Sequence, residues 1–80
     1  MDNTKKIGMV NSQKYEGIKY QVGLSDRGLV YMEIESSGIV SWSQVGKDVD
    51  MNSPNKISDA LGVATEYLKT NEDTNSFKRY

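Results

Sequence analysis

The sequence has no cysteine and no histidine among its 80 residues. Disulfides, thiol nucleophiles, cysteine or histidine zinc sites and imidazole acid–base catalysis are therefore excluded. No apolar run approaches the roughly 20 residues that a membrane helix needs, and there is no glycine-rich phosphate motif. We expect a soluble, cytoplasmic protein that is not an enzyme and uses no metal and no cofactor.

An excess of charge of one sign is also missing. Ten lysines and arginines stand against eleven acidic residues, for a formal net charge of -1. This balance is unlike that of a strongly basic nucleic-acid binder or of an acidic DNA mimic. The length predicts one small domain over 1–80, and the polar segments 1–6 and 70–80 are expected to be flexible tails.

Three segments alternate apolar and polar residues, which is typical of half-buried strands. The apolar positions are Ile18, Tyr20, Val22 and Leu24 in the first segment, Val30, Met32 and Ile34 in the second, and Val40 and Trp42 in the third. A candidate first strand precedes them at Ile7, Met9 and Val10.

Short loops that end in glycine separate these three strands. Residues 26–28 and 36–38 both fit a three-residue hairpin loop closed by a glycine in the left-handed conformation. Such loops would pair Ser25 with Leu29, and Glu35 with Ile39. Directly opposed residues of an antiparallel ladder share a face, so both hairpins would contribute to one apolar face.

This register makes specific predictions about side chains. Met32 would lie opposite Val22 on one side and Trp42 on the other, which makes Trp42 the expected anchor of the core. On the other face, Glu35 would pair with Lys19.

Residues 54–69 have the features of an amphipathic helix. Ser53 is the expected N-cap and Pro54 the first helical residue, where its missing N–H is not needed. Gly62, inside the helix, predicts a close approach to the sheet. The apolar stripe comprises Ile57, Ala60, Leu61, Ala64, Tyr67 and Leu68.

The predicted fold class is α+β: a small antiparallel β-meander of three or four strands with one C-terminal helix packed on one face. The order from KYQVGLSDRGLVYMEI through SWSQVGKD to ISDALGVATEYL resembles the antitoxin half of bacterial HicAB modules in architecture, although the Pro-x-x-x-Gly-Cys stretch of that family is missing. Double-stranded RNA-binding domains also place a helix after three strands, but their lysine cluster is reduced here to Lys56.

Paired carboxylates are the remaining route to catalysis or metal binding. Glu33 and Glu35 share one strand face, where we interpret them as solvated side chains, because one helix on a small sheet leaves no deep cleft. Residues 48–53 alternate oxygen-bearing side chains as a calcium loop does. However, Ser53 and Asp59 stand where an EF-hand needs glycine and glutamate.

Of the functions considered, protein binding requires the fewest special residue types. The predicted surface lies outside the helix-covered face and consists of Leu29, Tyr31, Glu33, Glu35, Ile39 and Val45. The leading hypothesis is a small non-enzymatic protein that acts by protein–protein contact, such as an inhibitor or adaptor of a host protein of the kind phages and mobile elements encode. Exposed strand edges also make a homodimer possible.

The alternative is a nucleic-acid-binding module. Its candidate residues are Lys14, Tyr15, Lys19 and Arg27, which would combine cations with a stacking aromatic ring. Glu33 and Glu35 on that same exposed sheet face would repel phosphates, so this hypothesis ranks second.

Overall fold

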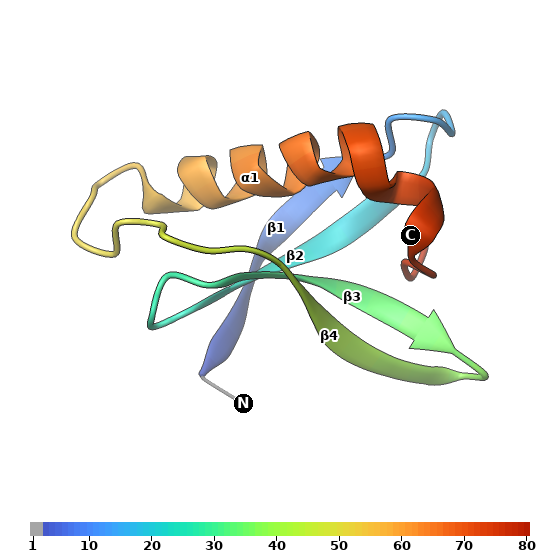
Figure 1. The fold of residues 1–80 in the computed structure, drawn as a ribbon, viewed down its shortest axis with the longest axis horizontal. Coiled ribbons are helices and arrows are strands. Elements are labelled where there is room, and N and C mark those ends of the chain that lie inside the picture. The colour runs from blue at the N-terminus through green and yellow to red at the C-terminus, as the bar shows by residue number, and fades with distance from the viewer. Residues whose placement is uncertain (1–2) are drawn as a thin grey trace.

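The computed structural model describes residues 3–80. Its elements, in chain order, are strands β1 (Thr4–Asn11), β2 (Lys19–Ser25), β3 (Val30–Ser36) and β4 (Ile39–Gly46), helix α1 (Lys56–Asn71) and a 3-10 turn, η1 (Glu72–Thr74). The strands form one antiparallel sheet in the order β1-β2-β3-β4, and α1 crosses one side of it (Figure 1). The predicted α+β meander with a C-terminal helix is confirmed. We call the side under α1 the helix face and the other side the open face.

The first predicted hairpin register is confirmed. The pairs between β2 and β3 are Val22–Met32, Gly23–Tyr31 and Leu24–Val30. Ser25 N donates to Leu29 O at 2.9 Å across the three-residue loop. Gly28 closes the loop with a φ of 80°, and a Cβ there would lie 2.4 Å from the carbonyl oxygen of Val49. Only glycine satisfies both the conformation and the contact.

The second predicted register is wrong by one residue. The loop consists of Ser37 and Gly38 alone, and both have positive φ, at 52° and 81°. These angles are typical of a two-residue type I′ turn, whose twist matches that of the strands. Ile39 therefore pairs with Ser36 instead of Glu35. Since side chains alternate between faces, this shift exchanges the faces of residues 39–44. A bulge at Val45 shifts the register again, so that Gly46 pairs with Val30.

Trp42 is consequently not the core anchor. It lies opposite Glu33 on the open face, not opposite Met32. Its ring occupies the space that Gly23 leaves in the middle of the sheet: a Cβ on Gly23 would lie 2.9 Å from the ring and 2.7 Å from Cγ2 of Thr4. Residues from both outer strands therefore meet above one glycine, which accounts physically for the position of Trp42.

The core lies between the helix face and α1. Its largest fully buried side chains are those of Met32, Leu68, Val22 and Val30. The predicted helical stripe is buried at Ala60, Ala64 and Leu68, with Leu61 and Tyr67 packed beside them, whereas Ile57 is exposed. The predicted first strand is confirmed and extends over all of β1.

The start of α1 differs from the prediction. The helix begins at Lys56, two residues after Pro54, and its N-cap is Asn55 without a side-chain hydrogen bond. Ser53 instead accepts hydrogen bonds from Asn55 N at its hydroxyl (3.1 Å) and from Lys56 N at its carbonyl (3.3 Å). Ser53 thus stabilises the turn that leads into the helix.

The close approach between helix and sheet occurs at Gly46 rather than Gly62. A Cβ on Gly46 would lie 2.2 Å from Cγ1 of Val63, so β4 and α1 touch there. A Cβ on Gly62 would meet nothing within 4 Å. Gly62 therefore faces solvent, and the prediction of a sheet contact at this glycine is wrong.

The expected tails belong to the fold. Thr4 to Lys6 lie in β1, while residues 1 and 2 of the expected N-terminal tail lie outside the described residues. At the other end, α1 and η1 extend the helical structure to Thr74. Beyond it, the C-terminal segment (residues 76–80) runs back to the sheet beside β2 and β3 (Figure 1).

The C-terminal segment is inserted where β2 and β3 separate. The two strands pair only over residues 22–24 and 30–32. Backbone hydrogen bonds join the segment to both: Lys19 and Tyr80 exchange two (3.2 and 2.9 Å), Glu35 N donates to Ser76 O (2.8 Å) and Lys78 N donates to Glu33 O (3.0 Å). The segment satisfies backbone groups that a flexible tail would leave without partners.

Phe77 anchors the C-terminal segment in the core. Its ring is buried, with its centroid 5.2 Å from that of Tyr20 and 6.4 Å from that of Tyr67. It also forms an antiparallel bridge with Ile34 of β3. Phe77 is the one buried residue of the segment, and its ring contacts attach the segment to the core.

Gly62→Ala should raise the free energy of unfolding by about 0.5–1 kcal/mol, because alanine lowers the entropy of the unfolded chain and meets no neighbour in the helix. Urea titration followed by the fluorescence of Trp42, the single tryptophan, measures it. Gly28→Ala is the contrasting variant and should lose more than about 1 kcal/mol. A destabilised Gly62→Ala protein would show that this glycine has a packing role.

Candidate functional site

The centre of the predicted protein-binding surface is closed. Tyr31 is 8% exposed and Glu33 7% exposed. The Glu33 carboxylate accepts a hydrogen bond from the Tyr80 hydroxyl, and Lys6 Nζ lies 4.0 Å from it. The C-terminal segment brings Tyr80 to this position, so the closure depends on a contact between residues distant in the sequence.

The other four predicted residues do not form one surface. Leu29 and Val45 are half-buried, and Val45 packs against the core. Glu35 is exposed, and its ion-pair partner is Lys78 at 3.7 Å instead of the predicted Lys19. Ile39 is 71% exposed at the end of the β3–β4 hairpin. Of the six residues, Ile39 and Glu35 are therefore the accessible ones.

Two of the predicted nucleic-acid-binding residues are engaged within the molecule. The ammonium group of Lys14 forms an ion pair with Asp73, and this partner raises the pKa of Lys14. The guanidinium group of Arg79 lies 4.6 Å from the ring centroid of Tyr15, in a cation–π contact. Stacking a base on that side of Tyr15 would require Arg79 to move.

The other two nucleic-acid candidates lie far apart along β2. Lys19 is the first residue of the strand, and Arg27 lies in the loop just beyond its last residue, Ser25. A strand rises about 3.3 Å per residue, so the two cations lie at opposite ends of the sheet. The structure does not gather the four predicted residues into one basic patch.

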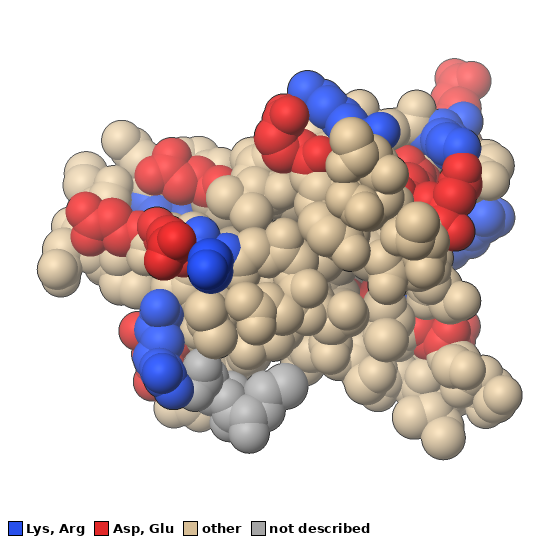
Figure 2. Space-filling model, in the orientation of Figure 1, with Lys and Arg blue, Asp and Glu red and all other residues tan. Residues whose placement is uncertain are grey.

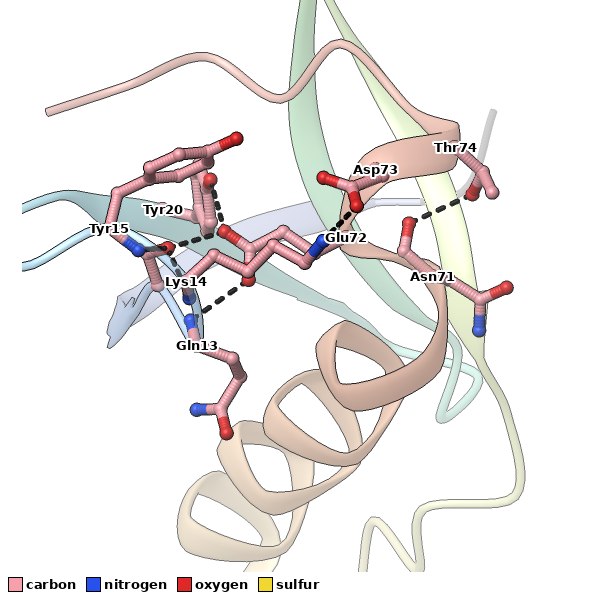
Figure 3. A network of polar contacts seen from close by, with 9 residues as sticks. Gln13, Lys14, Tyr15, Tyr20, Asn71, Glu72, Asp73 and Thr74 are labelled. Carbon is pink, nitrogen blue, oxygen red and sulfur yellow. Dashed lines mark hydrogen bonds and ion pairs between the residues drawn. The ribbon is translucent and has the colours of Figure 1, made fainter.

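A buried carboxylate joins the end of the helix to the loop after β1. Glu72 accepts hydrogen bonds from the Tyr20 hydroxyl (2.7 Å), from Gln13 N (2.9 Å) and from the Ser12 hydroxyl (Figure 3). Burial by itself raises the pKa of Glu72, but the hydrogen bonds outweigh burial and the pKa lies below its usual value. Burial and the bond to Glu72 raise the pKa of Tyr20.

A polar cavity of about 370 Å³ lies beside this carboxylate. Its lining residues are Tyr15, Tyr20, Glu72, Asp73, Asn75, Ser76, Phe77 and Arg79. The oxygens of Glu72 are already used by protein donors, and Lys14 pairs with Asp73 (Figure 3). Within residues 3–80, no three His, Cys, Asp or Glu side chains are grouped to hold a metal ion. We therefore interpret the cavity as part of a structural network and not as a binding site.

The β4 edge is better suited than this cavity to bind a partner. β4 is an outer strand, and none of its eight residues is charged. Ile39 and Val40 are 71% and 40% exposed, on a hairpin that extends away from α1 (Figure 1). Figure 2 shows this region, at the lower right, as mostly uncharged atoms. Outer strands usually carry charges or prolines that prevent pairing with other chains, and β4 has neither.

The turn geometry shows which backbone groups of β4 point outward. In a two-residue hairpin the flanking residues, here Ser36 and Ile39, form a hydrogen-bonded pair, and such pairs alternate along the ladder. Val40, Trp42 and Gln44 therefore direct their N–H and C=O groups away from β3. Among the hydrogen bonds of residues 3–80, no backbone group outside the strand ladder pairs with them.

The opposite edge of the sheet is protected. β1 carries Lys5 and Lys6, and a bulge interrupts its register between Lys6 and Gly8. Both features hinder the addition of another strand. β4 also has a bulge, but it lies at Val45 near the end of the strand and leaves residues 39–44 in regular register. A signal for this asymmetry was present in the sequence, because residues 36–46 are its longest stretch without a charged residue. The correct register was needed to show which groups point outward.

A scan against protein-family models finds no match, and comparisons with curated proteins and with solved structures find none either. Within residues 3–80, neither helix combines the length and the apolar character needed to cross a membrane. The geometry of the chain itself therefore carries the functional proposal.

Glu72→Gln should lower the free energy of unfolding at pH 7 by about 1–3 kcal/mol, since it weakens three hydrogen bonds to a buried charge. Because the folded-state pKa of Glu72 is lowered, its stabilisation is present above the unfolded pKa and is lost as pH falls through the folded pKa. The variant should therefore lose less stability than the wild type on acidification. Urea titrations at several acidic pH values measure this.

The control is Glu66→Gln, on the exposed surface of α1. Its ion pair with Lys69 should contribute less than about 1 kcal/mol. Equal losses in the two variants at pH 7 would contradict a special role for Glu72.

Proposed function

We propose that this chain is a small non-enzymatic protein-binding module, and that its β4 edge takes a strand from another polypeptide. The observation that carries the proposal is the free row of backbone groups on Val40, Trp42 and Gln44, on an outer strand without charges. In strand addition, main-chain hydrogen bonds supply affinity, and side chains on alternate positions supply specificity.

Exposed apolar side chains support the same edge. Val40 belongs to the free row and Ile39 precedes it, so an added strand would cover both side chains as its backbone pairs. A small protein that works in this way acts by occupying another protein, as an inhibitor or adaptor does.

The nucleic-acid alternative has less support from the geometry. The ammonium groups of Lys14 and Lys78 lie beside Asp73 and Glu35, so two cations near the C-terminal segment already have acidic partners. Nucleic-acid binding depends on cations that are available to phosphates and would therefore be weak here. The alternative remains as an outcome of the experiment below.

Ser41→Lys should reduce the recovery of partner polypeptides by about tenfold or more, which corresponds to roughly 1.4 kcal/mol. Ser41 is exposed within β4, and a lysine there would protect the edge as Lys5 and Lys6 protect β1. The measurement is quantitative affinity capture by tagged protein from a lysate, with mass spectrometry and with and without nuclease.

Ser58→Lys is the matched control. It adds the same charge at an exposed serine of α1, away from β4, and should leave the recovered protein unchanged. Equal recovery with Ser41→Lys and wild type would contradict binding at β4. Recovery that vanishes after nuclease would favour the nucleic-acid alternative.

A further inference from the structure

We infer that the strand taken by the β4 edge is β4 of a second copy of this chain, so that two sheets join into one across a two-fold axis. The inference rests on the proposed function, because it names the partner at that same edge. Two features of β4 and one of β1 lead to it: the spacing of the outward backbone groups of β4, the pattern of side chains around Trp42, and the protection of β1.

The outward groups match themselves in an antiparallel arrangement. With the two-fold axis at Trp42, Val40 pairs with Gln44 of the second copy, and Trp42 pairs with Trp42. All three outward residues of each copy then exchange N–H···O=C bonds with an outward residue of the other. Moving the axis by one residue in either direction places one outward residue of each copy opposite Gly38 of the turn or Gly46 beyond the bulge at Val45, so that two of the three outward residues still pair instead of all three.

The side chains match in the same register. Counting outward from Trp42, Ser41 lies opposite Ser43 of the second copy, so that small polar residues meet each other. The exposed Ile39 comes next to the end of the other β4, where Val45 forms the bulge.

No like charges face each other in this arrangement. The nearest charged residue after β4, Lys47, lies beyond the bulge and close to the turn of the second copy, which carries no charge. A second copy supplies this neutral, symmetric pattern by construction. The edge is therefore self-complementary, as an isologous interface requires.

The protection of β1 explains why such pairing would stop at two copies. A sheet with two open edges can add chains repeatedly and form fibres. Here the outer strand of each copy in the dimer is β1, with Lys5, Lys6 and its bulge. Pairing through β4 consequently consumes the one unprotected edge of each copy and closes the assembly.

Sedimentation over a range of protein concentrations tests the mass of the assembly. The wild type should sediment as a dimer that dissociates on dilution, Ser41→Lys should sediment as a monomer, and Ser58→Lys should match the wild type. Circular dichroism establishes that each variant is folded. A wild type that remains monomeric at the highest concentration that stays in solution would overturn the inference.

Cysteine pairs test the register, on a background without any cysteine. Ser41 and Ser43 of opposite copies form a pair without direct hydrogen bonds, with Cα atoms about 4.5 Å apart, which suits a disulfide. A mixture of Ser41→Cys and Ser43→Cys chains should therefore oxidise rapidly to a linked dimer. Ser41→Cys alone should link more slowly, because residue 41 lies two positions out of register with itself.

Ser58→Cys is the control for random collision. Linking of the mixture no faster than this control, in a protein that sediments as a dimer, would place the dimer interface elsewhere and overturn the inference. The wild type could instead be monomeric and capture a different protein, with this capture lost in Ser41→Lys. That result would overturn the second copy as partner and leave the proposed function standing. If Ser41→Lys changes neither capture nor mass, both proposals fail.

Discussion

The two-residue turn at Ser37 and Gly38 is the constraint on which the rest of this structure depends. It shifts β4 by one residue and thereby places Trp42 on the open face, above Gly23. It also determines that Val40, Trp42 and Gln44 direct their backbone groups outward. A bulge at Val45 then places Gly46 opposite Val30 and under Val63, where backbone and helix can touch. The position of Trp42 and the candidate binding edge therefore follow from the register that the turn sets.

The C-terminal segment completes what the strands leave open. β2 and β3 separate after three pairs, and residues 76–80 fill the gap with backbone hydrogen bonds to both strands. Phe77 adds to the core, and Tyr80 covers Glu33. The open face is consequently less available to a partner than its sequence suggests. Accessible apolar surface and free backbone groups remain together at the β4 edge.

Because the two sheet edges differ, strand addition is favoured at β4 and disfavoured at β1. Lysines and a bulge on β1 make strand addition there unfavourable, whereas β4 is uncharged and partly apolar. Water satisfies the outward groups of β4 in a monomer, so the edge is no defect of the fold. A partner strand would replace that water and cover Ile39 and Val40 at once, and both effects favour binding.

The sequence by itself determined the class and order of the elements, because alternation along strands and the stripe along α1 are local patterns. It also determined the first hairpin, where Gly28 closes a loop whose register both strands support. Only the tertiary structure decided the second hairpin, because local alternation favoured a three-residue loop, whereas the observed two-residue loop places Trp42 in the space above Gly23. The C-terminal segment and the burial of Tyr31 and Glu33 were beyond sequence reasoning for the same reason. They depend on contacts between residues distant in the chain, and no local pattern encodes such contacts.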